Sequence, residues 1–158
     1  MNESELERIL VIDDEDSIRK TISMILRREG YAVDTAENGK QAIEKTNESF
    51  YNLAVIDIRL PDMEGTELLT ALKETTPKMV KIILTGFPAL ENAVKAVNNG
   101  ADAYLIKPVN TNELLRVIRE QLNKQKKERE YGQERLAQFV ETRLEQLKTE
   151  ELEPEKTR

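Results

Sequence analysis

Short apolar runs recur along the first two thirds of the chain, and a longer segment with helical spacing follows each of them. The runs near residues 8–12, 52–57, 80–84 and 102–106 are nearly all apolar, which is typical of strands buried on both faces of a sheet. A shorter run, Tyr31-Ala32-Val33, starts another strand. The pattern therefore predicts five strands, each followed by a helix.

The segments between these runs predict the helices. In the first of them Ile18, Ile22, Ile25 and Leu26 recur at three- and four-residue spacing, and Gly30 then ends the helix. The expected helices cover residues 15–29, 38–48, 64–75 and 88–99, and a fifth begins near Thr111. Strands and helices that alternate at these lengths predict an α/β fold, with a five-stranded parallel sheet and helices on both faces.

The chain changes character after Leu122. Up to Arg135 it contains one large apolar residue, Tyr131, and one helix breaker, Gly132. Apolar residues then return at helical spacing, at Leu136, Phe139, Val140, Leu144 and Leu147. This pattern predicts an amphipathic helix with about three turns of apolar stripe.

Three interpretations of this stripe are open. It packs back on its own domain, it forms a short coiled coil or a docking helix, or it belongs to a frayed tail; the repeat is too short and irregular to decide. Burying one leucine is worth roughly 1.5–3 kcal/mol, which disfavours a stripe left free in water. We predict that the tail supports a homodimer.

Reactive side chains stand where four of the predicted strands end. Asp13 and Asp14 follow the first strand, Asp57 the third, Thr85 the fourth and Lys107 the fifth. The carboxyl ends of parallel strands open onto one crevice, so three carboxylates, a hydroxyl and an ammonium are expected to converge. This combination suits an aspartate that receives a phosphoryl group.

Carboxylates gathered in this way repel one another, by roughly 4 kcal/mol for two charges about 4 Å apart at an effective dielectric near 20. A bound proton or a cation must relieve that repulsion, and all-oxygen ligands in an open site favour Mg²⁺. Each residue taken singly also has a structural explanation. An acidic run suits a helix start, Thr85 suits a strand end, and Lys107 suits a surface.

Composition limits the chemistry further. The 158 residues contain no cysteine and no histidine, so disulfides, thiolate chemistry and imidazole catalysis are excluded, and any phosphohistidine must belong to a partner. No apolar run approaches 20 residues, so we expect no membrane insertion and a cytoplasmic protein. Residues 1–110 carry 13 basic and 19 acidic side chains, and residues 111–158 carry 11 of each. No basic patch indicates direct nucleic-acid binding.

Four sequence elements together resemble the receiver domain of two-component response regulators, a flavodoxin-like fold. They are VIDDED, VIDIRLPDMEG, ILTG and DAYLIKPV, in the family's order and spacing. The resemblance covers residues 6–123 and leaves 124–158 as a helical C-terminal extension. It is greatest to the receivers of nitrogen-regulator-type activators, but the extension is too short for the ATPase or DNA-binding domains that those proteins carry.

The resemblance implies a role for each of the converging residues. Asp57 would accept the phosphoryl group from a sensor histidine kinase. Asp14 and Asp57 would bind Mg²⁺ directly, Asp13 would assist through water, and the main-chain carbonyl of Arg59 would complete the metal ligands.

The same resemblance implies a switch. Thr85 would hydrogen-bond the phosphoryl oxygen, Lys107 would pair with it, and Tyr104 would change rotamer together with Thr85. The Lys107–Pro108 peptide matches a cis position of the family. Phosphorylation would thereby change contacts with a downstream protein, which the sequence does not identify.

An alternative is a Mg²⁺-dependent phosphohydrolase of the haloacid-dehalogenase type, which also forms an aspartyl phosphate. Asp14-Glu15-Asp16 imitates its Asp-x-Asp start, with Thr85 and Lys107 as later elements. That fold needs a further acidic metal-binding pair after the lysine, and no aspartate follows Asp102. We therefore expect a signalling protein and not an enzyme.

Overall fold

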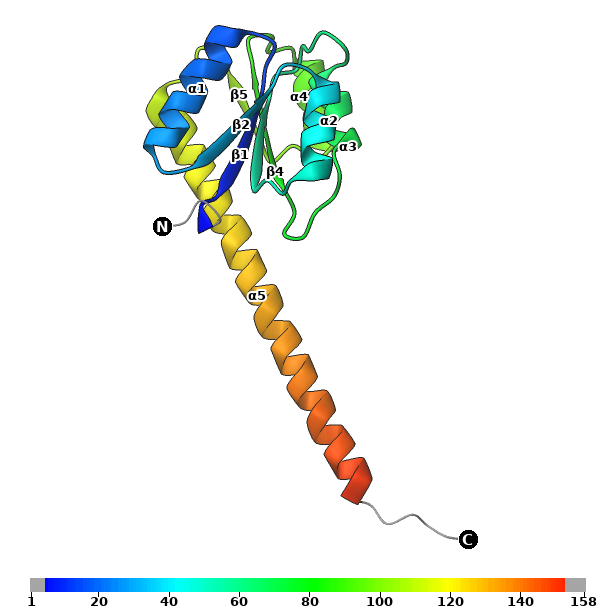
Figure 1. Ribbon diagram of the computed structural model, residues 1–158. Coiled ribbons are helices and arrows are strands. Elements are labelled where there is room, and N and C mark those ends of the chain that lie inside the picture. The colour runs from blue at the N-terminus through cyan, green and yellow to red at the C-terminus, as the bar shows by residue number, and fades with distance from the viewer. Residues whose placement is uncertain (1–4, 153–158) are drawn as a thin grey trace. The chain divides into compact units, whose positions relative to one another are not determined.

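The computed structural model describes residues 5–152 of a chain that divides into two units, residues 1–123 and 124–158. Strands and helices alternate along the chain (Figure 1). The strands are β1 (Arg8–Ile12), β2 (Ala32–Ala36), β3 (Leu53–Ile56), β4 (Val80–Thr85) and β5 (Ala103–Ile106). The helices are α1 (Asp16–Arg28), α2 (Gly39–Glu48), α3 (Gly65–Ala71), α4 (Leu90–Asn98) and α5 (Thr111–Leu152).

The strands form one parallel sheet in the order β2-β1-β3-β4-β5. Every residue of β3 and β4 is buried, which explains why these strands are apolar runs without polar alternation. The predicted fold class, a five-stranded parallel sheet covered by helices and followed by a C-terminal helix, is confirmed.

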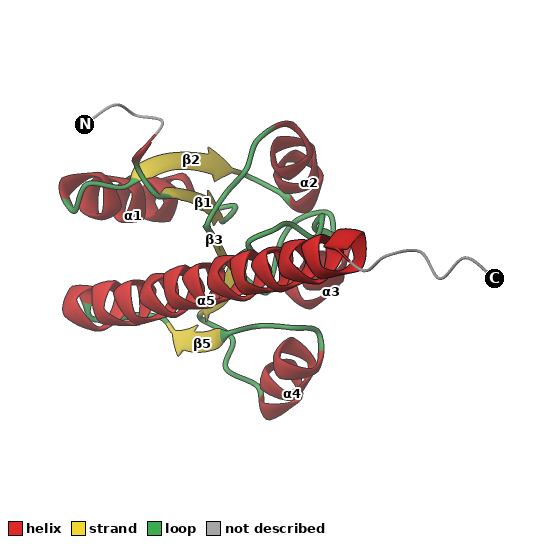
Figure 2. Cartoon of the chain, turned by 90° about the horizontal axis from the view of Figure 1, so that it is seen from below, coloured by secondary structure: helices red, strands yellow, loops and turns green. Residues whose placement is uncertain are grey.

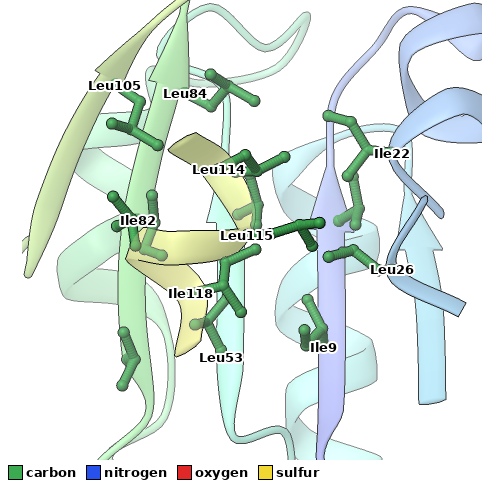
Figure 3. Close-up of a cluster of buried hydrophobic side chains, with 14 of the residues drawn as sticks. Ile9, Ile22, Leu26, Leu53, Ile82, Leu84, Leu105, Leu114, Leu115 and Ile118 are labelled. Atoms are coloured by element: carbon green, nitrogen blue, oxygen red, sulfur yellow. The ribbon is translucent and has the colours of Figure 1, made fainter. Parts of the chain in front are cut away.

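Each face of the sheet has its own apolar core. On one face, Ile22 and Leu26 of α1 and Ile118 of α5 pack on the sheet (Figure 3). On the other face, buried residues of α2, α3 and α4 pack on the alternate positions of the same strands. Figure 2 shows α1 and the beginning of α5 on one side of the sheet and α2, α3 and α4 on the other.

One predicted helix is shorter than expected. The sequence predicted a helix over 64–75, but α3 ends at Ala71 because Leu72 is extended, with φ −69° and ψ 138°. Leu72 is buried in the core of that face. The carbonyl of Leu69, left without a helical partner, accepts a hydrogen bond of 2.8 Å from Lys81 Nζ. A side chain on a later strand therefore completes the end of α3, and the local sequence does not contain that information.

The long helix α5 runs without a break through Gly132, a residue that disfavours helix. One glycine costs a helix interior only about 1 kcal/mol relative to alanine. The apolar residues of the predicted stripe are exposed, by 40–68% of their surface. No helix among residues 5–152 is long and apolar enough to cross a membrane.

Candidate functional site

The sheet brings the predicted residues to one edge. Ile12 pairs with Ile56, so Asp13 and Asp57 leave adjacent strands side by side. The backbone N–H of Asp57 still donates to the carbonyl of Ile12, at 3.0 Å. On the next pair of strands, the N–H of Lys107 donates to the carbonyl of Thr85, at 2.8 Å, which fixes where the lysine leaves β5.

Three carboxylates form the centre of the site. One oxygen each of Asp13, Asp14 and Asp57 lies within 4.8 Å of the others. Asp13 and Asp57 are 3% and 5% exposed, whereas Asp14 is exposed. Hard oxygen donors, two of them buried directly after strand ends and one open to solvent, fit a hydrated divalent cation such as Mg²⁺.

Lys107 closes the other side of this cluster. Its Nζ lies 2.6 Å from Asp13 Oδ2 and 3.3 Å from Asp57 Oδ2. Burial opposes the charged ammonium, but the hydrogen bond and the charge of Asp13, and then of Asp57, outweigh it and raise the pKa of Lys107. Two carboxylates therefore keep this partly buried lysine protonated and aimed at Asp57.

Burial is the main reason why the pKa of the Asp57 carboxyl is raised. The charge of Lys107 opposes that shift, and the charge of Asp13 adds to it. Asp57 is thus a carboxylate whose negative charge is poorly solvated, and its ionised form depends on the cations around it.

The backbone that follows Asp57 is shaped by a close approach of Gly65 and by contacts of Arg59. A Cβ added to Gly65 would lie 2.2 Å from the carbonyl oxygen of Asp57, so only glycine fits there. The backbone N–H of Arg59 points at Asp57 Oδ1, 3.4 Å away. The Arg59 guanidinium stacks on the ring of Phe87, with Cζ 3.7 Å from the ring centroid. This stack joins the loop after β3 to the loop after β4.

Thr85 and Tyr104 form a second group, linked through Phe87. Thr85 is fully buried, and its Oγ1 accepts a hydrogen bond of 3.1 Å from the backbone N–H of Phe87. The Tyr104 hydroxyl donates to the carbonyl of Phe87 at 3.5 Å, and partial burial raises the pKa of Tyr104. The predicted cis peptide at Lys107–Pro108 is confirmed.

Sequence reasoning did not identify Arg19, which contacts the backbone of the site residue Asp13. Arg19 is 8% exposed, and its guanidinium donates to the carbonyl of Asp13 at 2.7 Å and to Asp16 Oδ1 at 3.1 Å. Arg19 adjoins the buried face of α1, so a charged residue next to an apolar stripe was the signal that could have identified it.

Asp13, Asp14, Asp57 and Lys107 meet in one cluster, as predicted from the sequence. Their chemical roles stay predictions.

Comparison with known proteins identifies the family. Residues 9–119 match the family described as the response regulator receiver domain. The chain belongs to this family. The resemblance seen in the sequence is confirmed.

The relatives of this receiver include longer proteins. The chain is 39% identical over 114 residues to the transcriptional regulatory protein ZraR of Klebsiella oxytoca, covering 72% of this chain and 26% of ZraR. It is 36% identical over 115 residues to the transcriptional regulatory protein ResD of Bacillus subtilis, covering 73% and 48%. The chain thus spans between a quarter and a half of the length of these curated relatives.

Solved receivers match over nearly their full length. A CheY-like receiver domain protein of Methanospirillum hungatei has a TM-score of 0.75 and 48% identity, covering 78% of this chain and 99% of that one. TrrA of Thermotoga maritima in complex with Mg²⁺-BeF has a TM-score of 0.66 and 33% identity, covering 73% and 99%. The beryllofluoride-activated NtrC4 receiver domain dimer has a TM-score of 0.70 and 37% identity, covering 75% and 98%.

Proposed function

We propose that Asp57 accepts a phosphoryl group from the histidine of a sensor kinase, and that this modification switches protein–protein contacts. The observation that carries the proposal is the buried Asp57 carboxylate, flanked by two further aspartates and by Lys107 Nζ at 3.3 Å. A structural ion pair needs one carboxylate and one cation. Three carboxylates and one ammonium leave an excess of negative charge, which a bound metal ion would neutralise so that a negatively charged phosphoryl group can approach Asp57.

Asp13, Asp14 and Asp57 would hold Mg²⁺, together with the main-chain carbonyl of Arg59. The all-oxygen donor set and the solved complex of TrrA with Mg²⁺-BeF support this assignment. When bound, the ion supplies positive charge that offsets the negative charge of the acceptor carboxylate and of the phosphoryl oxygens.

In the transfer, an oxygen of Asp57 forms the new bond to phosphorus while the bond from phosphorus to the kinase imidazole nitrogen breaks. The electron pair of that bond stays on the imidazole nitrogen. Lys107 stabilises the charge on the equatorial phosphoryl oxygens, for which its position beside Asp57 is suited. Arg19 keeps the backbone of Asp13 in place through its 2.7 Å hydrogen bond.

The switch would begin at Thr85. Its hydroxyl would leave the N–H of Phe87 and donate to the phosphoryl oxygen, and Tyr104 would turn into the vacated space. The surface next to this pair exposes apolar side chains of α4 and β5, namely Leu90, Val94, Val97 and Ile106. The state change is a population shift whose size depends on how differently the two states bind the phosphoryl group.

We further propose that residues 6–123 are the receiver and that residues 124–158 are a helical extension that supports a homodimer; residues 153–158 lie outside the described part of the chain. The exposed stripe motivates this proposal, since Leu136 and Phe139 are 63% and 68% exposed. A downstream protein of unknown identity would read the phosphorylated state, without direct nucleic-acid binding. The absence of cysteine suits action in the reducing cytoplasm.

Labelling with a small phosphodonor tests the acceptor. Acetyl phosphate with Mg²⁺ should label the parent protein, and Asp57→Asn should abolish the label. Asp16→Asn is the matched control, because Asp16 is an exposed aspartate near the site whose partners are Arg19 and Lys20. Undiminished labelling of Asp57→Asn, with an acid-stable bond, would contradict the assignment.

Sedimentation tests the extension. Val140→Glu with Leu144→Glu places two charges on the apolar stripe, whereas Gln138→Glu with Thr142→Glu places the same charges on the opposite side of the helix. At tens of micromolar the parent and the control pair should sediment as dimers, and the stripe pair as monomers. A monomeric parent, with and without acetyl phosphate, would mean that the stripe serves another protein or packs within the chain.

A further inference from the structure

One carboxylate ties the loop that carries the acceptor to a different part of the fold. We call residues 57–64, between β3 and α3, the acceptor loop. Asp62 lies in this loop, and its Oδ1 accepts the backbone N–H of Gly39 while its Oδ2 accepts that of Lys40, each at 2.9 Å. Gly39 is the first residue of α2. Both oxygens of one side chain therefore bind the first turn of a helix 23 residues earlier in the chain.

Met63 adds a second contact at the same place. A Cβ added to Gly39 would lie 2.4 Å from Met63 Sδ and 2.6 Å from Met63 Cγ. Gly39 is buried, and its missing side chain is what lets Met63 lie directly on the first turn of α2. The acceptor loop is thus held to α2 by a polar contact and an apolar contact side by side.

The charge of Asp62 suits this position. The first turn of α2 has no acidic residue of its own, and the free N–H groups of a helix start favour a negative charge. The hydrogen bond from Gly39, followed by that from Lys40, holds the pKa of Asp62 below its usual range. Asp62 therefore stays ionised near neutral pH and supplies a charge that α2 lacks.

Hydrogen bonds within the acceptor loop connect Asp62 to the backbone of Arg59. Within it, the N–H of Leu60 donates to the carbonyl of Met63 at 3.3 Å, and Arg59 forms an antiparallel bridge with Glu64. The loop is a closed turn, so a restraint on Asp62 also restrains the backbone of Arg59. Arg59 is the residue whose carbonyl is proposed to complete the metal ligands.

We propose that Asp62 is a positioning residue for phosphoryl acceptance, which anchors the acceptor loop to α2 and thereby fixes the backbone of Arg59 beside Asp57. This role rests on the proposed function. The two oxygens of Asp62 accept from Gly39 and Lys40, so Asp62 is not itself proposed to bind the metal ion or the phosphoryl group. It acts through the loop, as partners of a ligand residue commonly do.

Amide hydrogen exchange in the metal-free protein tests the anchor directly. In Asp62→Ala the amides of Leu60 and Gly65 should exchange about tenfold faster, and Mg²⁺ affinity by titration should fall about tenfold. Asp62→Asn keeps one acceptor oxygen and should restore part of both. Asn38→Ala is the matched control, because Asn38 caps the same helix through the N–H of Gln41, at 2.8 Å, without touching the acceptor loop.

The control separates anchoring from plain destabilisation. Asn38→Ala should weaken α2 while leaving loop exchange and Mg²⁺ affinity as in the parent. Unchanged exchange in Asp62→Ala, or an equal change in Asn38→Ala, would overturn the role of Asp62. A parent that neither binds Mg²⁺ nor accepts phosphoryl from acetyl phosphate would overturn the proposed function itself, and with it any role of Asp62 in acceptance.

Discussion

Two largely buried lysines lie near opposite ends of neighbouring strands. Lys107 follows the end of β5 and contacts the carboxylates of Asp13 and Asp57. Lys81 lies near the start of β4, and its Nζ contacts the neutral carbonyl of Leu69 at 2.8 Å. Burial disfavours both ammonium groups, yet the pKa of Lys107 is raised, whereas burial, with the nearby charge of Lys78, lowers the pKa of Lys81.

The difference between Lys107 and Lys81 shows that burial of a lysine does not by itself indicate a catalytic or binding site. Lys81 also has an aspartate nearby, but Asp102 Oδ2 accepts the backbone N–H of Lys81, at 2.8 Å. The same residue types therefore support a helix end at one end of the sheet and form the proposed phosphoryl-acceptor cluster at the other. Direct contact between ammonium and carboxylate distinguishes them.

Replacing each lysine by methionine should show the difference between Lys107 and Lys81 most clearly. Lys107→Met removes the cation beside the proposed phosphoryl position and should slow labelling by acetyl phosphate about 100-fold, as loss of a charge-stabilising donor commonly does. Lys81→Met should label at the parent rate. Equal loss in both variants would mean that folding, and not the contact with Asp57, limits the reaction.

Water access to the proposed phosphoryl group should set how long phosphorylated Asp57 persists. Arg59 and Phe87 follow Asp57 and Thr85 by two residues each, and their large side chains stack on one another, so we expect slow self-dephosphorylation. Replacing both by serine should shorten the lifetime of the phosphorylated protein by about tenfold, roughly 1.4 kcal/mol in the barrier. The decay of labelled protein measures this, with each single substitution for comparison. Decay no faster than in the parent would show that water access is not the control.

Most of the fold was predictable because the information is local. Nearly continuous apolar runs gave the strands, and the residues that follow them gave Asp13, Asp57 and Lys107, since parallel strands end at one edge. Arg19 and Asp62 were missed because their roles depend on partners brought close by the fold. Nothing in the sequence around Asp62 reveals that its carboxylate reaches the N–H groups of Gly39 and Lys40.

The helix that was predicted too long shows the same limit. The end of α3 depends on Lys81, which comes from a later strand, and on the burial of Leu72.

Lys81 should contribute to the stability of the fold without contributing to phosphoryl acceptance by Asp57. Lys81→Met leaves the carbonyl of Leu69 without its donor and should lower the free energy of unfolding by about 1 kcal/mol. Urea unfolding measures this, and Lys20→Met, which removes an exposed lysine of α1, is the control with an expected change within about 0.5 kcal/mol. A Lys81→Met protein as stable as the parent would show that burying the ammonium costs as much as its hydrogen bond contributes.

A smaller effect concerns pH. The pKa of Lys81 is lowered in the folded protein, so the unfolded chain binds more protons between that pKa and the ordinary value of about 10.4. The stability of the parent relative to Lys81→Met should therefore rise as pH increases through this interval. Urea unfolding of both proteins at steps from neutral pH to about 10.4 measures the difference. A difference that stays flat or falls would contradict the direction of the shift.

We propose above that the cluster around Lys107 makes Asp57 the phosphoryl acceptor, and the modified residue can be identified chemically. Borohydride reduces an acyl phosphate to an alcohol, so it converts a phosphorylated aspartate into homoserine. The protein should be treated with acetyl phosphate and Mg²⁺, reduced, digested and mapped by peptide mass spectrometry. We predict homoserine at position 57 and unmodified Asp13 and Asp14. Homoserine at another aspartate, or at none in a protein that carries label, would contradict the account.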